Sequence, residues 1–115
     1  MRLVLSALAL ACLAVLPAKG NEYSKPPEPF TDAFLSDAGH IEAGEEIWRG
    51  QCTHCHGAKA YPGKAPKLKP RKYKPLFVYV RVTDGFRKMP GWKEVFTDLE
   101  RMQVTAYIMS DEFAP

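Results

Sequence analysis

Two cysteines and a histidine lie together in the run Cys52-Thr53-His54-Cys55-His56, a C-x-x-C-H pattern that occurs once in the chain. This spacing is the attachment signature of a c-type haem, because two thiols bond to the two porphyrin vinyl groups while the following imidazole points at the iron. A bound haem supplies redox chemistry that the polypeptide positions and tunes. The run therefore predicts one covalently attached haem c, held by Cys52 and Cys55, with His56 as an iron ligand.

C-x-x-C pairs also occur in zinc sites and in thioredoxin-like redox loops. A structural zinc site takes four Cys or His ligands, whereas the chain beyond residue 20 has two cysteines and three histidines without an H-x(3–5)-H pair. No βαβ pattern surrounds the two cysteines, as a thioredoxin-like site requires. The main alternative to haem attachment is an ordinary disulfide or thiol pair, and a lack of visible haem absorption would favour it.

Residues 1–20 have the pattern of a secretory signal peptide, because an apolar run from Leu3 to Leu16 follows Arg2 and ends near a small-x-small cleavage site, Ala18-Lys19-Gly20. The run is shorter than the roughly 20 residues that span a bilayer. We therefore expect export to the periplasm without stable membrane insertion. Cys12 lies inside the apolar run and matches a lipidation site poorly, so we expect it to leave with the signal peptide.

Residues 21–115 suffice for one small domain and are too few for two. Three prolines lie in residues 21–36, which we expect to form an extended N-terminal arm. A flexible leader is the favoured role of this arm, and docking through its aromatic residues is the alternative. Residues 37–115 form the haem domain. A core of this size usually needs reinforcement, and a covalently bound apolar macrocycle would supply much of its interior.

Helical periodicity begins between Asp37 and His40 and continues to the two cysteines of the motif. Residues of one face recur at steps of three or four: Ile41, Gly44, Trp48, Cys52 and Cys55. The first predicted helix would therefore carry both haem-bearing sulfurs on its inward face, beside a glycine and a large aromatic ring.

Two further helices have local boundary signals. Pro75 opens a predicted helix that Gly85 ends, because proline suits the first helical position and glycine the position after the last. Thr97 and Glu100 form a T-x-x-E capping box before a broad apolar stretch, which predicts a last helix. Nothing in the sequence argues for a sheet, so the predicted fold class is all-α.

Over residues 41–110 the chain resembles the class I cytochromes c, which are small all-helical electron carriers with one haem. The resemblance implies the small class I cytochrome c fold, in which the N- and C-terminal helices cross and the haem is part of the core. In this family a glycine and an aromatic residue of the first helix meet a leucine and an aromatic residue of the last. The corresponding residues here are Gly44, Trp48, Val104 and Tyr107.

The resemblance also implies a second iron ligand, because the family places a methionine sulfur opposite the histidine, usually just before a proline. Met89-Pro90 matches this pattern. Met89 is therefore the expected partner of His56, and His with Met is an established ligand pair in cytochromes c. His40 and His54 are the competing ligands, and a bis-histidine iron would have a lower reduction potential.

The same resemblance implies two further cofactor-binding residues, Pro66 and Leu68, and Trp92 is a third candidate. The carbonyl of Pro66 accepts the second N–H of His56, which would fix the orientation of the imidazole. Leu68 packs against the haem. Trp92 lies at the haem edge or near its propionates, and a purely structural place in the core is its alternative.

Between Lys59 and Lys74 the chain has seven Lys or Arg residues and no acidic residue: Lys59, Lys64, Lys67, Lys69, Arg71, Lys72 and Lys74. Many of the acidic residues lie before residue 47 or after residue 93. Such asymmetry steers encounter with an oppositely charged partner. We expect a redox protein with an acidic surface, and a solvated loop that serves solubility is the alternative. No nucleic-acid-binding module is recognisable, so nucleic acid is not an expected partner.

These features predict a monomeric periplasmic electron carrier that is not an enzyme, with iron cycling between ferric and ferrous while His56 and Met89 stay bound. The resemblance suggests a quinoprotein alcohol dehydrogenase, a cytochrome bc1 complex or a terminal oxidase as partners. A subunit role within such an enzyme is the alternative to free shuttling. The alternative function is a haem enzyme or gas-binding sensor, which needs an open or displaceable sixth position.

Overall fold

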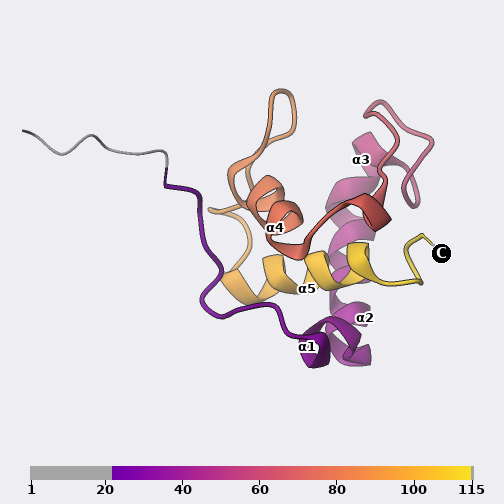
Figure 1. Ribbon diagram of the computed structural model, residues 1–115. Helices are drawn as coiled ribbons and strands as arrows, with labels where there is room; N and C mark the ends of the chain where they lie inside the picture. The colour runs from indigo at the N-terminus through magenta and orange to yellow at the C-terminus, as the bar shows by residue number, and fades with distance from the viewer. Residues whose placement is uncertain (1–21, 115) are drawn as a thin grey trace, which may run out of the picture.

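The structure is a computed structural model that describes residues 22–114. Its helical elements are α1 (Asp32–Ser36), α2 (Ala38–Ile47), the π-helical turn η1 (Trp48–Cys52), α3 (Thr53–His56), the 3₁₀ turn η2 (Pro70–Lys72), α4 (Pro75–Asp84) and α5 (Asp98–Met109) (Figure 1). The described residues contain no β-strand, which confirms the all-α prediction. The predicted signal peptide, with Cys12, lies outside them. None of the described helices is long and apolar enough to cross a membrane.

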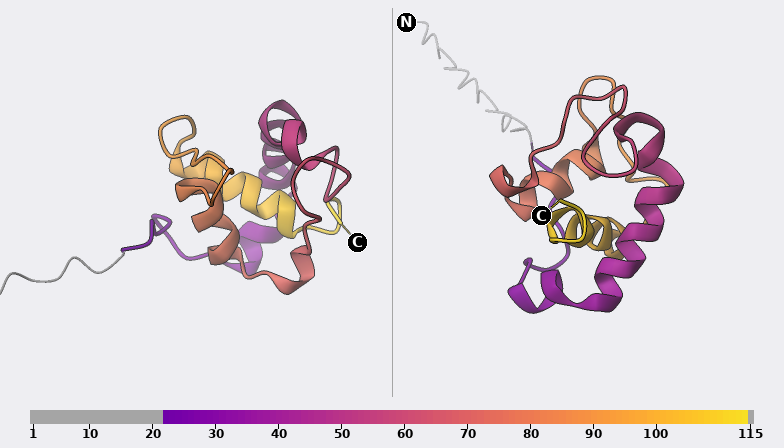
Figure 2. Two further views of the ribbon diagram at one scale, coloured as in Figure 1. Left: turned by 90° about the horizontal axis from the view of Figure 1, so that it is seen from above. Right: turned by 90° about the vertical axis from the view of Figure 1, so that its right-hand side faces the viewer.

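The last helix, α5, lies between α2 and α4 and contacts both (Figure 2). Gly44 allows α2 and α5 to approach each other closely where they cross. A Cβ atom added at Gly44 would lie 2.9 Å from the Cβ of Tyr107 and closer still to the carbonyl oxygen of Gln103. Only a residue without a side chain fits this approach. The predicted crossing of the first and last helices at Gly44 and Tyr107 is confirmed.

The boundaries of α4 and α5 follow their local signals. α4 begins at Pro75 and ends before Gly85, whose φ of 76° lies in the left-handed region that favours glycine. The Thr97 hydroxyl accepts from the Glu100 N–H at 3.2 Å, and the Glu100 carboxylate accepts from the Thr97 N–H at 2.8 Å. This pair is the predicted capping box, so both helix predictions are confirmed.

The N-terminal arm differs from the expected extended leader. Its last five residues form α1, because the Thr31 side chain accepts from the Phe34 N–H and caps the helix. Nearer the N-terminus, the Ser24 hydroxyl donates to the Asp84 carboxylate at 2.5 Å. The ring of Phe30 lies 5.9 Å from the ring of Tyr79, edge to face. Both contacts join the arm to α4.

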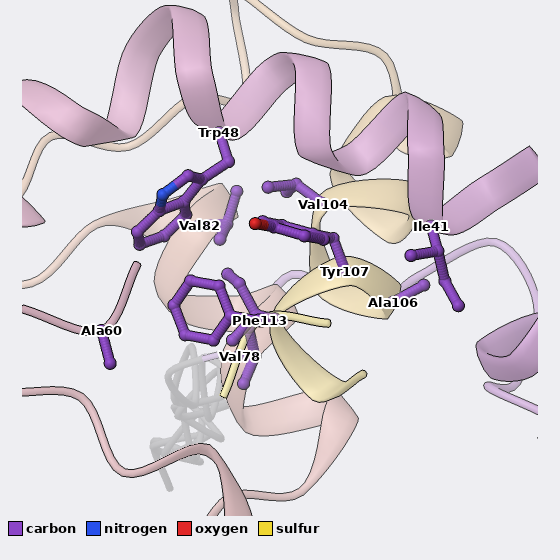
Figure 3. Packing of buried hydrophobic residues seen from close by; sticks show 10 residues of the cluster. Ile41, Trp48, Ala60, Val78, Val82, Val104, Ala106, Tyr107 and Phe113 are labelled. Atoms are coloured by element: carbon purple, nitrogen blue, oxygen red, sulfur yellow. The ribbon is translucent and has the colours of Figure 1, made fainter. Parts of the chain in front are cut away.

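Aromatic rings fill the core where α5 passes the end of α2 (Figure 3). Phe113 lies edge-on to Trp48 and to Tyr107, with ring centres 4.7 Å and 5.4 Å apart. All three side chains are at most 2% exposed. The C-terminal segment therefore packs over Trp48, four residues before Cys52, and fixes the part of the helical run that leads into the motif.

Candidate haem-binding site

The C-x-x-C-H motif begins at the last residue of η1 and ends with α3. In η1 the Thr53 N–H donates to the carbonyl of Trp48, five residues earlier. The extra residue in this turn rotates the following residues by about 100° relative to a regular α-helix. Cys52 is half-buried against the core, whereas Cys55 is exposed. The prediction that both sulfurs share one inward face assumed unbroken α-helical periodicity, which η1 interrupts, and the shared face stays a prediction.

Both cysteines are free thiols, with no disulfide between them. Burial, followed by the proximity of Cys55, raises the pKa of the Cys52 thiol to about 12. The uncharged thiol is therefore the dominant form at neutral pH. A thioether is also uncharged, so the apolar surroundings of Cys52 are compatible with the bond that haem attachment makes there.

His56 ends α3 with its imidazole against the indole of Trp48, the ring centres lying 5.4 Å apart. Burial lowers the pKa of His56, which favours a neutral imidazole with a lone pair available to a metal. Its Nδ1 is buried and has no hydrogen-bond partner among the described residues. The predicted bond to the Pro66 carbonyl is therefore not formed in this structure, and the role of Pro66 stays a prediction. A neutral imidazole, which keeps a lone pair on one ring nitrogen, fits a ligand role.

The loop after the motif is fixed to the helical run by backbone contacts. Gly57 ends α3 with a φ of 83°. The Ala65 N–H donates to the carbonyl of Cys55 at 2.8 Å, and the indole N–H of Trp48 donates to the carbonyl of Ala58 at 2.9 Å. Sequence reasoning assigned Trp48 to helix packing and missed this anchoring bond. The available signal was its position on the helical run that carries the motif.

Met89 lies in the loop between α4 and α5. Phe86 and Met89 each donate an N–H to the carbonyl of the other, both at 3.0 Å. The Trp92 N–H donates to the carbonyl of Val82 at 2.9 Å, which ties the loop to α4. Four of the predicted cofactor-binding residues are half-buried and pack against the same hydrophobic core: Cys52, Leu68, Met89 and Trp92. The fold thus gathers sulfur, aliphatic and aromatic side chains from separate segments at the edge of one core.

The competing histidines lie in other surroundings. The ring of His40 stacks on Phe34 at 4.1 Å between ring centres, and its Nδ1 lies 3.2 Å from the amide nitrogen of Gln103. His40 therefore links α1, α2 and α5, while the side chain of His54 is exposed. Within residues 22–114, no three His, Cys, Asp or Glu side chains converge on a position that could hold a metal ion. The zinc alternative therefore has no ligand set there.

Three comparisons with known proteins agree with this geometry. The sequence model of the family described as "Cytochrome C oxidase, cbb3-type, subunit III" matches residues 39–108. The quinohemoprotein alcohol dehydrogenase ADH-IIG of Pseudomonas putida is 33% identical over 101 residues, which cover 81% of this chain and 13% of that enzyme. The chain therefore corresponds to a small part of the enzyme's length.

A solved structure, the c-type cytochrome NirC, superposes on the chain with a TM-score of 0.54 and 23% sequence identity. The superposition covers 69% of this chain and 99% of that one. At this identity the likeness shows the fold, which is that of a c-type cytochrome with the last helix crossing the first.

Proposed function

Because the chain belongs to the c-type cytochrome family whose sequence model matches residues 39–108, we propose that it is a periplasmic one-electron carrier with His56 and Met89 as axial ligands. Covalent haem c and electron transfer come with membership of the family, and Cys52 and Cys55 have the spacing that attachment requires. The bound haem supplies the exchange of one electron between ferric and ferrous iron.

The proposed ligand pair rests on the positions of His56 and Met89 relative to one hydrophobic core. His56 packs against Trp48, and Trp48 belongs to the core cluster against which Met89 packs from another segment. A nitrogen donor and a sulfur donor therefore border one apolar core. Two neutral ligands in apolar surroundings suit an iron that changes charge without exchanging ligands, and His with Met raises the reduction potential relative to two histidines.

Other residues of the site restrict the movement of the two proposed ligands. Trp48 holds the ring of His56 and, through its bond to Ala58, the start of the following loop. The backbone pair between Phe86 and Met89 restricts the loop that carries the sulfur. An electron carrier benefits from such rigidity, because a ligand set that stays in place costs little reorganisation when the iron changes oxidation state.

The charge distribution supports a partner with an acidic surface. Residues 59–93 contain eleven Lys or Arg residues and one acidic residue, Asp84. The other described segments, 22–58 and 94–114, contain three Lys or Arg residues and twelve acidic residues. The basic segment includes the loop after the motif, α4 and the Met89 loop, which are the elements around the proposed site. Opposite charge on a partner would raise the association rate and orient the encounter.

We infer that the electron donor is a quinoprotein alcohol dehydrogenase. The relative from Pseudomonas putida is named as an enzyme with both a quinone and a haem, and this chain matches 13% of its length. A separate carrier of the same type would perform the haem step for a dehydrogenase that lacks its own haem. A respiratory complex such as a terminal oxidase would then accept the electron, and the carrier would act as a monomer.

The first test is a pair of visible spectra, oxidised and reduced, of the protein exported together with a haem-maturation system. We expect sharp reduced bands and the weak far-red band of a ferric iron–methionine bond. Haem without that far-red band, together with carbon monoxide binding to the reduced protein, would contradict the carrier function and favour a haem enzyme or gas sensor. Recovery of the protein from the cytoplasmic fraction alone would contradict the proposed location.

A further inference from the structure

A row of three aromatic rings and one guanidinium extends along α4 and just beyond both of its ends. The rings of Tyr73 and Phe77 have centres 5.3 Å apart. The guanidinium carbon of Arg81 lies 4.9 Å from the ring centre of Phe77 and 3.9 Å from that of Phe86. Phe77 is 45% exposed and Phe86 48%, whereas Tyr73 and Arg81 are half-buried. We call these four residues the α4 row.

The α4 row connects two parts of the proposed haem site. At one end, the hydroxyl of Tyr73 accepts from the Lys69 N–H at 2.9 Å, immediately after Leu68. At the other end, Phe86 is paired through two backbone hydrogen bonds with Met89. The row therefore extends from the loop after the motif to the loop of the proposed sulfur ligand.

The positive charge of Arg81 has no anionic partner among the described residues, where the ion pairs are formed by Arg49, Arg71 and Arg101. Asp84, the one acidic residue of α4, accepts hydrogen bonds from the N–H and the hydroxyl of Ser24. Arg81 is instead held between two phenylalanine faces, which attract a cation without neutralising it. The fold thus places an uncompensated charge, on a side chain with restricted freedom, against the residue that pairs with Met89.

We propose that Arg81 is a positioning residue that raises the reduction potential of the iron by holding a positive charge beside the Met89 loop. This inference rests on the proposed function, because it requires Met89 to be the sulfur ligand. Uptake of one electron removes one positive charge from the iron centre. A fixed cation nearby therefore favours the ferrous form over the ferric form, and the rings of Phe77 and Phe86 keep that cation in place.

The test is the midpoint potential of the holoprotein and of Arg81→Gln, measured by mediated spectroelectrochemical titration at low ionic strength. Removal of this charge should increase the ferric-to-ferrous ratio at a fixed electrode potential by about two- to tenfold. A tenfold change corresponds to about 59 mV for one electron. Arg81→Lys keeps the charge and loses the planar contact with the rings, so its potential should lie between those of the wild type and Arg81→Gln.

Arg87→Gln is the matched control, because Arg87 also lies over Phe86, at the longer distance of 5.1 Å, and is exposed. It removes the same net charge, but from an exposed side chain that solvent and salt screen more than the half-buried Arg81. Its shift should therefore be clearly smaller than that of Arg81→Gln. Equal shifts in the two variants, or none in Arg81→Gln, would overturn the inference. The far-red band is recorded for every variant: its absence from the wild type would refute the Met89 ligation, whereas its presence with an unchanged potential refutes only the role of Arg81.

Discussion

Met89 is half-buried in a loop whose neighbours, Phe86 to Lys88 and Pro90, are exposed. The inward position of this one side chain is what the proposed ligand role requires. We expect Met89→Ala to leave the haem covalently attached through Cys52 and Cys55 while opening the sixth position. The ferric far-red band should disappear, the reduced protein should bind carbon monoxide, and the ferric-to-ferrous ratio at fixed potential should rise more than about tenfold.

Met109→Leu is the control for this substitution, because Met109 is also half-buried against the core but lies on α5. Its spectrum should match that of the wild type. A wild-type spectrum in Met89→Ala, with the far-red band retained, would show that another residue ligates the iron.

The hydroxyl of Tyr79 contributes to the stability of the fold and to its pH dependence. Its side chain is fully buried, and its hydroxyl donates to the carboxylate of Asp98 at 3.0 Å. Burial, and then the hydrogen bond to Asp98, raises the pKa of Tyr79 above its usual value near 10. The unfolded chain therefore loses this proton at a lower pH than the folded protein, so the stability that Tyr79 contributes is present below about pH 10 and declines above it.

Tyr79→Phe should lower the free energy of unfolding by about 1 kcal/mol at neutral pH, because one hydrogen bond is lost. It should also flatten the decline of stability above about pH 10, as measured by urea unfolding of the holoprotein. The exposed Tyr61 provides a control in Tyr61→Phe, which should change neither quantity. An equally steep alkaline decline in Tyr79→Phe would mean that other groups cause it.

At the scale of elements, the sequence was sufficient where local chemistry sets a boundary. The signals at these boundaries act within a few residues of the chain, so the limits of α4 and α5 could be predicted from Pro75, Gly85 and the Thr97–Glu100 box. The π-helical turn η1, in which the Thr53 N–H donates to the carbonyl of Trp48, has no such signature. The break in α-helical periodicity before the motif could therefore not be predicted from spacing. The motif itself could, since haem attachment dictates residue types directly.

The crossing of α2 and α5 gives a prediction at this scale. Gly44→Ala should lower the free energy of unfolding by about 1–3 kcal/mol, because the new methyl group overlaps the backbone of Gln103 and the side chain of Tyr107. Gly50→Ala is the matched control. A Cβ at Gly50 meets nothing within 4 Å, and alanine in a helical turn stabilises by up to about 1 kcal/mol relative to glycine. Thermal or urea unfolding that ranks the two variants in the opposite order would contradict the crossing geometry.

At the scale of the whole molecule, basic and acidic residues are separated both along the sequence and in the fold. The segment from Lys59 to Lys93 folds into the elements that border the proposed haem site, while the acidic residues lie mainly on α1, α2, α5 and the segments next to them. What the sequence could not show is that the arm contacts the one acidic residue of the basic segment. Ser24 donates to both oxygens of Asp84, the one acid there.

This separation predicts a salt-dependent encounter with an acidic donor. Six exposed lysines lie between the motif and α4, and the four nearest α4 are Lys67, Lys69, Lys72 and Lys74. Replacing all four by glutamine should slow second-order reduction by a purified quinoprotein alcohol dehydrogenase about tenfold or more at low ionic strength, and should flatten the dependence of the rate on salt. Stopped-flow absorbance of the haem at several salt concentrations measures both effects.

The corresponding Lys→Arg variant at the same four positions separates charge from side-chain identity, because it keeps every positive charge and should retain the wild-type rate and salt dependence. Steering acts before contact, so the glutamine variant should approach the wild-type rate as salt shortens the range of the field to about 3 Å at 1 M. A glutamine variant that is slow at all salt concentrations would instead indicate loss of specific contacts within the complex. A rate unchanged at low salt would remove these lysines from the donor interface.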